Sequence, residues 1–488
     1  MNAELVGILP EIVVTVGGLL LLVLPGIKSA RLLGLITLGF LAAGFDLKVI
    51  GLIQRSVSPP LFYGMLLQDR LSGFFQLLIL VFMSLVTLSV MGYAKEEVKG
   101  RRELYALLLL TTVGLLVVVG AQHFALLYLS LELVSILSYL LTGIAKRESL
   151  AVEGALKYFL FGALATGAML YGISLIYGLT GTMDIPSLAT SFPDTMKQAP
   201  FLGTFSLLLL LIGFGFKVAL VPFHMWAPDA YEGASAPIAA FISVGPKLAG
   251  FAVLSRLFLI HISPAVGFWP PLLAVVAALS MTIGNVVALV QTNVKRLLAY
   301  SSIAHAGTIT VGLAVATPFG MSAAMYYLLA YLLMNIGAFA GVAAVGNAAG
   351  REDIGAFAGL SRRDPLLAFL MTISLLSLAG IPPLAGFFSK MWIMAAALEA
   401  KAVWLAVVTG LNSVVAIFYY MKIVKAMYLD PAPAGAPAVR GAALLKLSLL
   451  FCTAALFGLG LFQGPWLVFT GYALPVVLKP TGIPWMGP

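Results

Sequence analysis

Charged residues are scarce in this chain. Asp, Glu, Lys and Arg make up 10% of its 488 residues, whereas 61% are hydrophobic. A soluble globular domain carries about 25% charged residues. No single core hides so large an excess of apolar side chains, so the sequence predicts a polytopic membrane protein.

Cysteine is almost absent as well, because Cys452 is the only one. A single thiol excludes a disulfide framework and any cysteine-ligated cluster, which needs several thiolates. The four histidines are scattered without the spacing of a metal site, and no glycine-rich phosphate loop follows a strand. We therefore expect no cofactor and no metal in this chain.

The net charge of +9 is compatible with a nucleic-acid partner. In a membrane chain it is explained more simply by loop lysines and arginines that set the orientation, so no nucleic acid is expected. The first apolar segment, residues 4–25, lacks a basic start and a small-residue cleavage site. It is interpreted as a retained helix and not as a signal peptide.

A membrane span needs about 20 apolar residues, and fourteen segments qualify. They are 4–25, 31–53, 71–93, 103–119, 122–142, 154–178, 203–223, 236–260, 270–290, 296–316, 319–346, 364–395, 402–428 and 441–463. The predicted fold class is an all-α polytopic membrane protein. The apolar tail after Gln463 is rich in Pro and Gly and is expected to lie along the surface.

The basic residues of the loops predict the orientation. Loops after odd-numbered helices hold fourteen: Lys28, Arg31, Lys95, Lys99, Arg101, Arg102, Lys146, Arg147, Lys295, Arg296, Arg351, Arg362, Arg363 and Arg440. The other side holds five: Arg55, Arg70, Lys197, Lys401 and Lys479. The excess places the odd loops in the cytoplasm and both termini on the outer side of the plasma membrane.

Several charges fall inside the apolar segments, where each costs roughly 2.5–3.5 kcal/mol on insertion scales. Lys48, Arg256, Lys425 and Lys446 lie near helix ends and can snorkel to the interface. Deeper positions are held by Lys217, Lys247, Lys390 and Lys422 and by the acid Glu132, in LLYLSLELVSILSYLL. Lys157 lies in the first turn of its segment.

Two segments carry a similar motif, VPFHMW at residues 221–226 and FFSKMW at 387–392. Each is interrupted by proline, at Pro222 and at Pro382–Pro383, with a basic residue nearby. Five helices separate the two, an odd number, so the copies face opposite ways as inverted repeats do. Broken backbone at membrane depth is tolerated where it is buried in protein or lines a hydrated cavity. The alternative is ordinary proline kinking.

The deep cations are lysines, which can lose a proton, whereas arginine effectively cannot. Glu132 is the best partner for Lys217, because Glu11 and Asp46 lie nearer the N-terminal periphery, where Asp46 can pair with Lys48. A pair at about 4 Å is worth ~4 kcal/mol at an effective dielectric near 20. This interaction energy exceeds the ~2.3 kcal/mol that moving a proton against 100 mV costs. Opening and closing the pair can therefore load and unload a proton; the alternative is a static structural ion pair.

Polar residues between these charges can support a chain of ordered waters. They are His224, Ser243, Lys247, Asn285, Ser301, Ser302, His305, Thr308, Thr310, Tyr326, Asn335, Ser374, Ser377 and Ser389. His305, in AYSSIAHAG, is the strongest relay candidate because histidine titrates near neutrality. The alternative for each is a hydrogen bond between helices.

The motifs resemble those of the proton-pumping, antiporter-like subunits of respiratory complex I, which are related to subunits of multi-subunit cation/proton antiporters. The chain is most similar to the subunit N group of NADH-quinone oxidoreductases. The supporting stretches are ILPEIVV, LYLSLELVSILSYLL, EGALKYFLFGALATG, KVALVPFHMWAPDAYEGASAPIAAFISVGPKLAG, NVKRLLAYSSIAHAG and GIPPLAGFFSKMW. They cover the middle and late thirds of the chain.

The resemblance implies roles for particular residues. Glu132 matches the family's ion-pair glutamate, and Lys217 the lysine of its broken helix. Lys247 matches the central lysine of the next helix, and Lys390 the terminal lysine of the second broken helix. Further relay candidates are Lys157, in the KYF motif, together with His224, His305 and Lys422. The aligned MW motifs place His224, and not Lys217, opposite Lys390, so the repeat and the family roles disagree by several residues.

The resemblance also implies an organisation. We expect an N-terminal three-helix flank (1–102), a first five-helix repeat (103–262), a second, inverted five-helix repeat (263–430), and a C-terminal helix with a surface tail (431–488). This chain ends too soon to carry the long lateral helix of the family's largest pumping subunit. Expected partners are lipid, antiporter-like neighbours, a lateral helix from another subunit, and subunits that carry flavin and iron-sulfur clusters.

The leading functional hypothesis is a proton-translocating subunit of NADH-quinone oxidoreductase without a redox site of its own. A sodium/proton antiporter subunit is the second. A structural membrane scaffold with static ion pairs is the third.

Overall fold

The computed structural model describes residues 3–23, 29–54, 60–93, 102–262, 267–433, 435, 437–439 and 442–474. Within these ranges the chain is helical, and extended pairing is confined to isolated bridges such as that between His123 and Asp184. Seven residues that served to predict the orientation lie outside the described ranges: Lys28, Arg55, Lys95, Lys99, Arg101, Arg440 and Lys479.

The first part of the chain forms α1 (Ala3–Gly7), α2 (Leu9–Val23), α3 (Ala30–Gln54), α4 (Arg70–Met91), α6 (Arg102–Val118), α7 (Phe124–Thr142), α8 (Ser149–Thr180), α9 (Leu188–Gln198), α10 (Pro200–Val218), α11 (Trp226–Gly233), α12 (Ala236–Leu254) and the π-helix η1 (Ser255–His261). The second part forms α13 (Trp269–Ala288), α14 (Val294–Ala314), α15 (Pro318–Ala349), the 3₁₀ helix η2 (Ile354–Phe357), α16 (Leu360–Arg363), α17 (Pro365–Ala379), α18 (Ala385–Glu399), α19 (Val403–Tyr428), α20 (Ala443–Leu461) and α21 (Gln463–Ala473).

Eleven helices of the described residues are long and apolar enough to cross a membrane: α3, α4, α7, α8, α10, α12 with η1, α13, α14, α15, α19 and α20. The apolar helices α2 and α17 have only 15 residues each, and α6 has 17. Every one of the fourteen predicted segments contains helix in the structure. The prediction of an all-helical membrane protein is thereby confirmed, with eleven full-length candidate spans.

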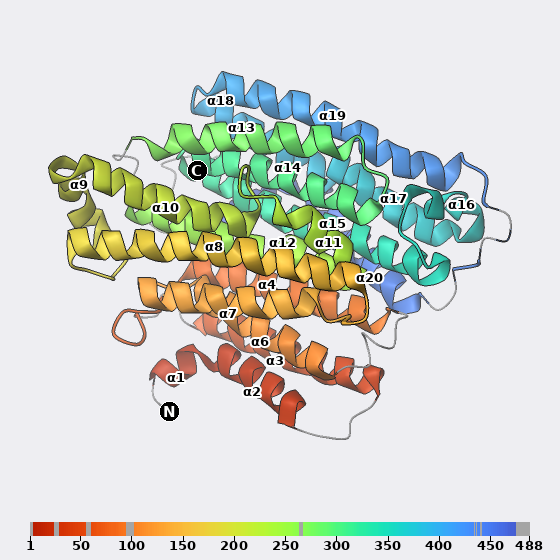
Figure 1. The fold of residues 1–488 in the computed structure, drawn as a ribbon, viewed down its shortest axis with the longest axis horizontal. Helices are drawn as coiled ribbons and strands as arrows, with labels where there is room; N and C mark the ends of the chain where they lie inside the picture. Colours follow the sequence, from red (N-terminus) through yellow and green to blue (C-terminus); the bar gives the residue numbers. More distant parts are fainter. Residues whose placement is uncertain are drawn as a thin grey trace.

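The centre of the bundle is built by α12, α14 and α15. Every residue of α12 is buried, and it packs against α4 and α15, while α14 packs against α13 and α15. In Figure 1 these helices lie between α2 and α3 at one edge and α18 and α19 at the other. The outer helices expose large apolar side chains, including Leu164, Val286 and Phe418, as expected for surfaces that face lipid or other membrane subunits.

Two helices break beside proline, as the sequence predicts. After α10, Ala219 takes a left-handed conformation with φ 58°, and the chain turns through a cis Val221–Pro222 bond before α11 begins. After α17, Gly380 also takes a left-handed conformation, with φ 89°, and a cis Pro382–Pro383 bond precedes α18. Each break leaves the last carbonyls of the preceding helix without their usual partners.

Three of the four basic residues expected to snorkel have buried or specific partners instead. Lys48 donates a hydrogen bond to Gln68, in the segment before α4, and not to its neighbour Asp46. Arg256 is buried against Asp69. Lys446 pairs with Asp364 at 2.5 Å. Tertiary packing decides these outcomes, because each partner comes from a distant part of the chain. Lys425 remains exposed, 3.7 Å from Asp430.

The segment after Gln463, predicted to lie along the surface, is helical where the structure describes it. It forms α21, which buries Leu467, Thr470 and Ala473 and packs against α4 and α15. Its other face is exposed, including Phe469 and Tyr472. The remainder of the tail lies beyond the described residues.

We predict that Gly307→Ala destabilises the protein by about 1–3 kcal/mol, the usual cost of overpacking. A Cβ on Gly307 of α14 would lie 2.7 Å from the carbonyl oxygen of Ala277 and 2.8 Å from the amide nitrogen of Met281, both in α13. Backbone atoms cannot move aside as a flexible side chain does. Thermal melting of the purified protein measures the effect.

The matched control is Gly167→Ala, because Gly167 lies inside α8 with open space around its Cα. Alanine there should stabilise the helix by up to about 1 kcal/mol. Equal melting temperatures for the two variants would contradict the close approach of α13 and α14.

We also predict that Asp69→Asn costs about 3–5 kcal/mol, because it breaks a buried ion pair. Arg256 donates two parallel hydrogen bonds to the Asp69 carboxylate, at 2.8 and 3.0 Å. Asparagine can retain the helix cap that Asp69 forms on the amide of Ser72. The loss would therefore report the ion pair, that is, the charge together with the Arg256 hydrogen bond that a carboxamide NH2 cannot accept. Melting temperatures check the effect. Adding Arg256→Met to Asp69→Asn should recover part of the lost stability.

Although burial acts to raise it, pairing with Arg256 holds the pKa of Asp69 below its usual range. Stability from this pair is therefore fully present above about pH 4 and is lost only as the pH falls through that lowered pKa. A melting temperature of Asp69→Asn equal to that of the wild type at neutral pH would show that the pair contributes nothing.

Candidate functional site

Lys217 lies in the last turn of α10, immediately before the first helix break. Its ammonium nitrogen is 3.8 Å from Oε1 of Glu132 in α7, and it donates a hydrogen bond to the hydroxyl of Ser135, also in α7. Lys217 is buried, and Oε1 of Glu132 has no hydrogen-bond partner. The pairing predicted from the sequence is therefore present in the structure as a loose contact, with the lysine held more closely by a serine.

Lys247 lies on α12 at the centre of the bundle and is almost completely buried. Its ammonium nitrogen donates to the hydroxyl of Tyr231 at 3.2 Å. The Tyr231 hydroxyl is 3.1 Å from that of Ser302, which accepts a hydrogen bond from Tyr331 at 2.8 Å. Four side chains from α11, α12, α14 and α15 thus form one hydrogen-bonded group around a buried cation.

His305 follows Ser302 by three residues on α14 and extends the polar group along that helix. Its Nδ1 is 2.7 Å from the hydroxyl of Tyr327, and its Nε2 is 3.0 Å from that of Tyr420. The Tyr420 hydroxyl also contacts Ser301. Both ring nitrogens therefore have hydroxyl partners, one from α15 and one from α19.

Lys390 lies on α18, immediately after the second helix break. Its ammonium donates to the carbonyl oxygens of Leu378 and Ala379 at 3.0 and 2.9 Å. These are the last carbonyls of α17, which the break leaves free. A cation is stabilised at the C-terminal end of a helix by the free carbonyls and by the helix dipole. No acidic partner of Lys390 lies within ion-pair distance in the described ranges.

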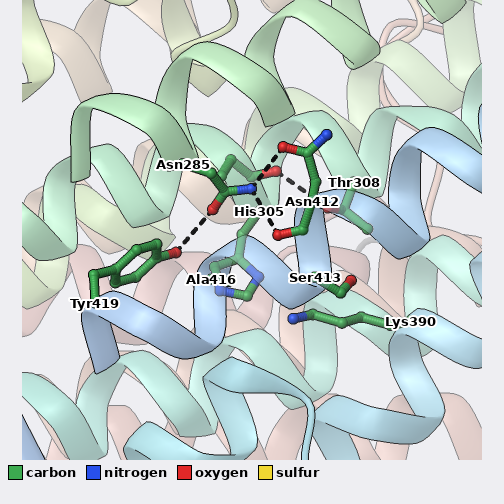
Figure 2. Close-up of a pocket in the computed structure, with 9 residues that line it drawn as sticks. Asn285, His305, Thr308, Lys390, Asn412, Ser413, Ala416 and Tyr419 are labelled. Atoms are coloured by element: carbon green, nitrogen blue, oxygen red, sulfur yellow. Dashed lines mark hydrogen bonds between the residues drawn. The ribbon is translucent and has the colours of Figure 1, made fainter. Parts of the chain in front are cut away.

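A small cavity connects the surroundings of Lys390 and His305, and Figure 2 shows both side chains at its wall. Its volume is about 10 Å³, near the lower limit for holding one water molecule. Asn285 and Asn412 line the other side, where the Asn285 amide donates to the Asn412 carboxamide at 3.0 Å. Tyr419 donates to the Asn285 side chain at 3.0 Å. The cavity is lined by polar groups that can bond a water.

The two helix breaks differ in where their lysines lie. Lys217 precedes its break and lies on α10, whereas Lys390 follows its break and lies on α18. His224, the position aligned with Lys390 by the MW motif, is buried in the turn before α11, and its Nδ1 has no partner. The MW motifs therefore align His224, and not Lys217, with Lys390 because the two lysines lie on opposite sides of their helix breaks.

Lys157 lies apart from these groups, at the contact of α8 with α11. Its ammonium pairs with Glu153 at 2.7 Å and Asp229 at 2.8 Å. Arg296 reaches Asp229 at 2.6 Å and Glu232 at 2.8 Å. Burial acts to raise the pKa of Asp229, but the hydrogen bonds from Lys157 and Arg296 hold that pKa below its usual range. Asp229 is therefore charged at neutral pH.

Lys422, the remaining lysine predicted to lie deep in its segment, is also separate from these groups. The side chain is exposed and its ammonium donates to the carbonyl of Leu289, at the end of α13. The C-terminal part of α19 lies at the edge of the bundle (Figure 1), so a lysine there reaches the surface. The structure does not bring Lys422 together with the other lysines.

The sequence interpretation missed four tyrosines: Tyr231, Tyr327, Tyr331 and Tyr420. It selected Tyr326 instead, which points away and donates to the Leu459 carbonyl of α20. A signal was present in YYLLAYLL, since Tyr327 and Tyr331 are four residues apart and lie on one helical face. Aromatic residues are common in the chain, so this spacing alone did not distinguish functional tyrosines from those that only pack in the core.

Comparisons with known proteins identify the family of this chain. A family model described as "NADH:quinone oxidoreductase/Mrp antiporter, TM" matches residues 121–416, more than half of the chain. NADH-quinone oxidoreductase subunit N 2 of Acidobacterium capsulatum is 39% identical over 478 residues, which cover 93% of this chain and 95% of the relative. F(420)H(2) dehydrogenase subunit N of Methanosarcina mazei is 38% identical over 480 residues, with 95% and 97% covered.

Solved structures show the same fold. A chain of respiratory complex I from Thermus thermophilus with bound aureothin superimposes with a TM-score of 0.80 at 33% identity, covering 94% of this chain and 98% of that one. A chain of the Mrp complex from Dietzia sp. DQ12-45-1b superimposes with a TM-score of 0.83 at 23% identity, covering 97% of each, and shares the fold alone. The chain therefore belongs to the subunit N family of the NADH-quinone oxidoreductases, within the wider family of NADH:quinone oxidoreductase and Mrp antiporter membrane subunits.

Proposed function

We propose that this chain is a proton-translocating membrane subunit of a redox-driven NADH-quinone oxidoreductase. The observation that carries the proposal is the row of buried proton-exchanging groups through the centre of the bundle. It runs from Glu132 and Lys217 through the Lys247 group to His305 and Lys390. Lysine, histidine, tyrosine and serine all offer a proton donor, and the last three also accept.

Helix α14 supports the continuity of this row. Ser301, Ser302 and His305 lie within about one turn of the helix, since residues three and four apart are neighbours. Ser302 joins the Lys247 group, and His305 faces the same cavity as Lys390. Within the described residues no direct hydrogen bond joins Lys217 to Lys247. That step of a proton path therefore needs water or a side-chain movement.

The Glu132–Lys217 contact is suited to loading and releasing a proton. At 3.8 Å the attraction is worth ~4 kcal/mol at an effective dielectric near 20. Separating the two charges favours loss of a proton from Lys217 toward the neighbouring groups, and closing them favours its return. Ser135 holds the ammonium while the carboxylate oxygen remains without a hydrogen bond, which supports a contact that opens and closes.

Lys390 is suited to the other end of the path. Carbonyls of α17 partly offset the cost of its charge, and no carboxylate holds it there. Its proton affinity therefore depends on the charge of nearby groups such as His305, which lines the same cavity. A proton that arrives at the centre repels the proton on Lys390 and promotes its release.

The finer architecture follows from the same proposal. We infer fourteen spans, with the shorter α2, α6 and the broken α17–α18 segment completing the eleven long helices. The first five-helix repeat is 103–262 and the second, inverted repeat is 263–430, flanked by 1–102 and 431–488. The two broken helices, each followed by another lysine-bearing segment, support this division. Both termini are placed on the outer side of the plasma membrane by the loop charges.

The partners belong to the proposal as well. Flavin and iron-sulfur clusters are expected in other subunits, together with antiporter-like neighbours and a lateral helix from another chain. One relative bears the name of an NADH-quinone oxidoreductase and another that of an F(420)H(2) dehydrogenase. We therefore assign the choice of electron donor to the partner subunits and not to this chain.

A cation/proton antiporter subunit is the alternative, supported by the shared family with Mrp antiporters. Several buried ammonium groups along one path repel a bound sodium ion, which favours the proton. Copurification with flavin and iron-sulfur subunits separates the two functions. A static scaffold is the third possibility, and the variants below test it.

We predict that Lys217→Ala and Lys390→Ala each lower proton pumping and coupled electron transfer while the complex still assembles. Loss of a positioned proton-transfer group costs on the order of 10²-fold in rate. Pumping and electron transfer are measured in parallel in membranes, with assembly checked on native gels. Lys425→Ala is the control, because that lysine is exposed. Assembled variants with wild-type activities would instead mark the lysines as structural.

We further predict that Tyr231→Phe reduces pumping with little effect on assembly, because it removes only the hydroxyl that joins Lys247 to Ser302. Tyr326→Phe is the matched control, since this equally buried tyrosine donates to a backbone carbonyl away from the lysines. Pumping per electron transferred is the measured quantity. Equal pumping by the two variants would exclude Tyr231 from the path.

A further inference from the structure

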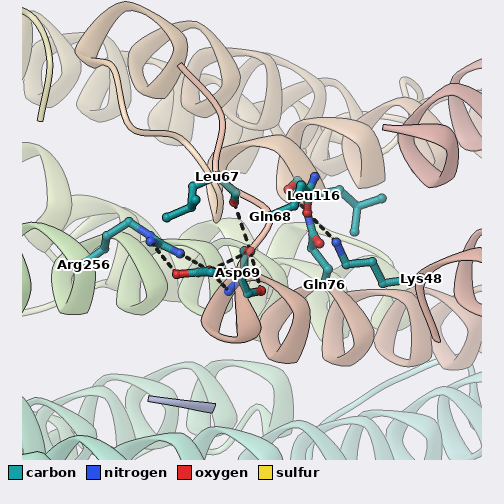
Figure 3. Close-up of polar contacts among 8 residues, drawn as sticks. Lys48, Leu67, Gln68, Asp69, Gln76, Leu116 and Arg256 are labelled. Carbon is teal, nitrogen blue, oxygen red and sulfur yellow. Dashed lines mark hydrogen bonds and ion pairs between the residues drawn. The ribbon is translucent and has the colours of Figure 1, made fainter. Parts of the chain in front are cut away.

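A second group of buried polar side chains lies in the N-terminal bundle, away from the row of lysines and tyrosines. Glu11 of α2 is 4% exposed, Lys48 of α3 is 6% exposed, and Gln76 of α4 is fully buried. Gln68, in the segment before α4, lies between them. Figure 3 shows Lys48 reaching toward Gln68 and Gln76, with Asp69 and Arg256 on the other side.

The hydrogen bonds around Glu11 are unevenly shared between its two oxygens. Oε1 accepts from the amides of both Gln68 and Gln76, each at 3.1 Å. The Gln68 carbonyl oxygen in turn accepts from Lys48, and the Gln76 amide also donates to the Leu116 carbonyl at 2.7 Å. Two buried oxygens are left without any donor: Oε2 of Glu11 and Oε1 of Gln76.

These two unpaired oxygens belong to side chains that already share a hydrogen bond. A carboxylate only accepts, so an ionised Glu11 cannot satisfy the Gln76 oxygen. A protonated Glu11 has one O–H donor. Placed on Oε2, it can donate to Oε1 of Gln76 and close a cyclic acid–amide pair. A single proton would then satisfy both atoms, and buried polar atoms left unsatisfied are costly.

We propose that Glu11 is a proton-binding site of this chain, separate from the row of lysines, which holds its proton on Oε2 against the carboxamide of Gln76. Loss of that proton leaves a carboxylate that faces the Lys48 ammonium through Gln68. The cluster therefore has two states that differ by one proton.

Lys48 is the charged group that acts most strongly on Glu11, and it favours the carboxylate, so proton binding on Glu11 competes with that attraction. Asp69, in the segment before α4, is engaged by Arg256 of η1 through two hydrogen bonds. Lys48 of α3 reaches Glu11 only through Gln68, and the charge of Asp69 acts on Lys48 as well. The ionisable residues of α6, which packs along α2, are Arg102, Glu103 and Tyr105 in its first turn, far from the Leu116 carbonyl.

The test compares Glu11→Gln with Glu11→Leu in the complete membrane complex. Glutamine is neutral and has the same shape, and its amide can donate to Gln76 as the acid O–H does. We expect Glu11→Gln to assemble to wild-type levels and to melt at the wild-type temperature. Glu11→Leu removes the acceptor that the amides of Gln68 and Gln76 share, although the Gln76 amide keeps its bond to the Leu116 carbonyl. We expect this variant to reduce the amount of assembled complex and to lower its melting temperature.

Two other states of the Glu11 cluster predict the opposite result for Glu11→Gln. If Glu11 is a carboxylate that balances Lys48, or if a water bridges the two oxygens, Glu11→Gln leaves Lys48 without its counter-charge and assembly falls. Lys48→Met in the same chain would then restore assembly. Any loss in Glu11→Gln overturns the proposal, whether or not Lys48→Met restores it, and so does a Glu11→Leu variant as stable as the wild type.

Infrared spectroscopy supplies a second readout. The carbonyl band of a protonated carboxylic acid should appear in the spectrum of the wild type minus that of Glu11→Gln. Absence of the band overturns the proposal even if both complexes are equally stable. Neither measurement depends on proton pumping, so the result stands apart from the function proposed for the central lysines.

Discussion

A lysine ammonium buried in a membrane protein must find its partners within the protein, and much of this structure follows from that requirement. An uncompensated charge at this depth costs roughly 2.5–3.5 kcal/mol on insertion scales. Lys390 meets the requirement with backbone: the break after α17 frees two carbonyls, and both accept from its ammonium. The broken helix and the buried lysine thus stabilise each other, because free carbonyls at membrane depth need a donor as much as the ammonium needs acceptors.

The other buried lysines solve the same problem with side chains. Lys217 has a serine and a more distant carboxylate, and Lys247 donates to the hydroxyl of a tyrosine. Hydroxyl groups satisfy an ammonium without neutralising it, so each lysine remains sensitive to nearby charge. A fully neutralised row of ion pairs would be more static. Such partners are compatible with the proton exchange proposed for this row of lysines.

The two broken segments share the same backbone arrangement, but their lysines lie on different sides of the break. Both helices end with a residue in the left-handed conformation, and both continue after a proline. Lys217 precedes its break and takes partners from a neighbouring helix, whereas Lys390 follows its break and caps the preceding half-helix. Equivalent architecture is therefore compatible with different chemistry in the two halves, which explains why alignment of the MW motifs mispaired the lysines.

The sequence by itself determined the class of the protein, the positions of its helices, the two breaks and the central residues Glu132, Lys217, Lys247, His305 and Lys390. These follow from local properties, namely runs of apolar residues, prolines and rare charges within those runs. Only the tertiary structure decided the partners. The tyrosines around Lys247 and His305, the burial of Arg256 against Asp69 and the exposure of Lys422 depend on which helix faces meet. Such contacts join residues tens to hundreds of positions apart, and no local pattern encodes them.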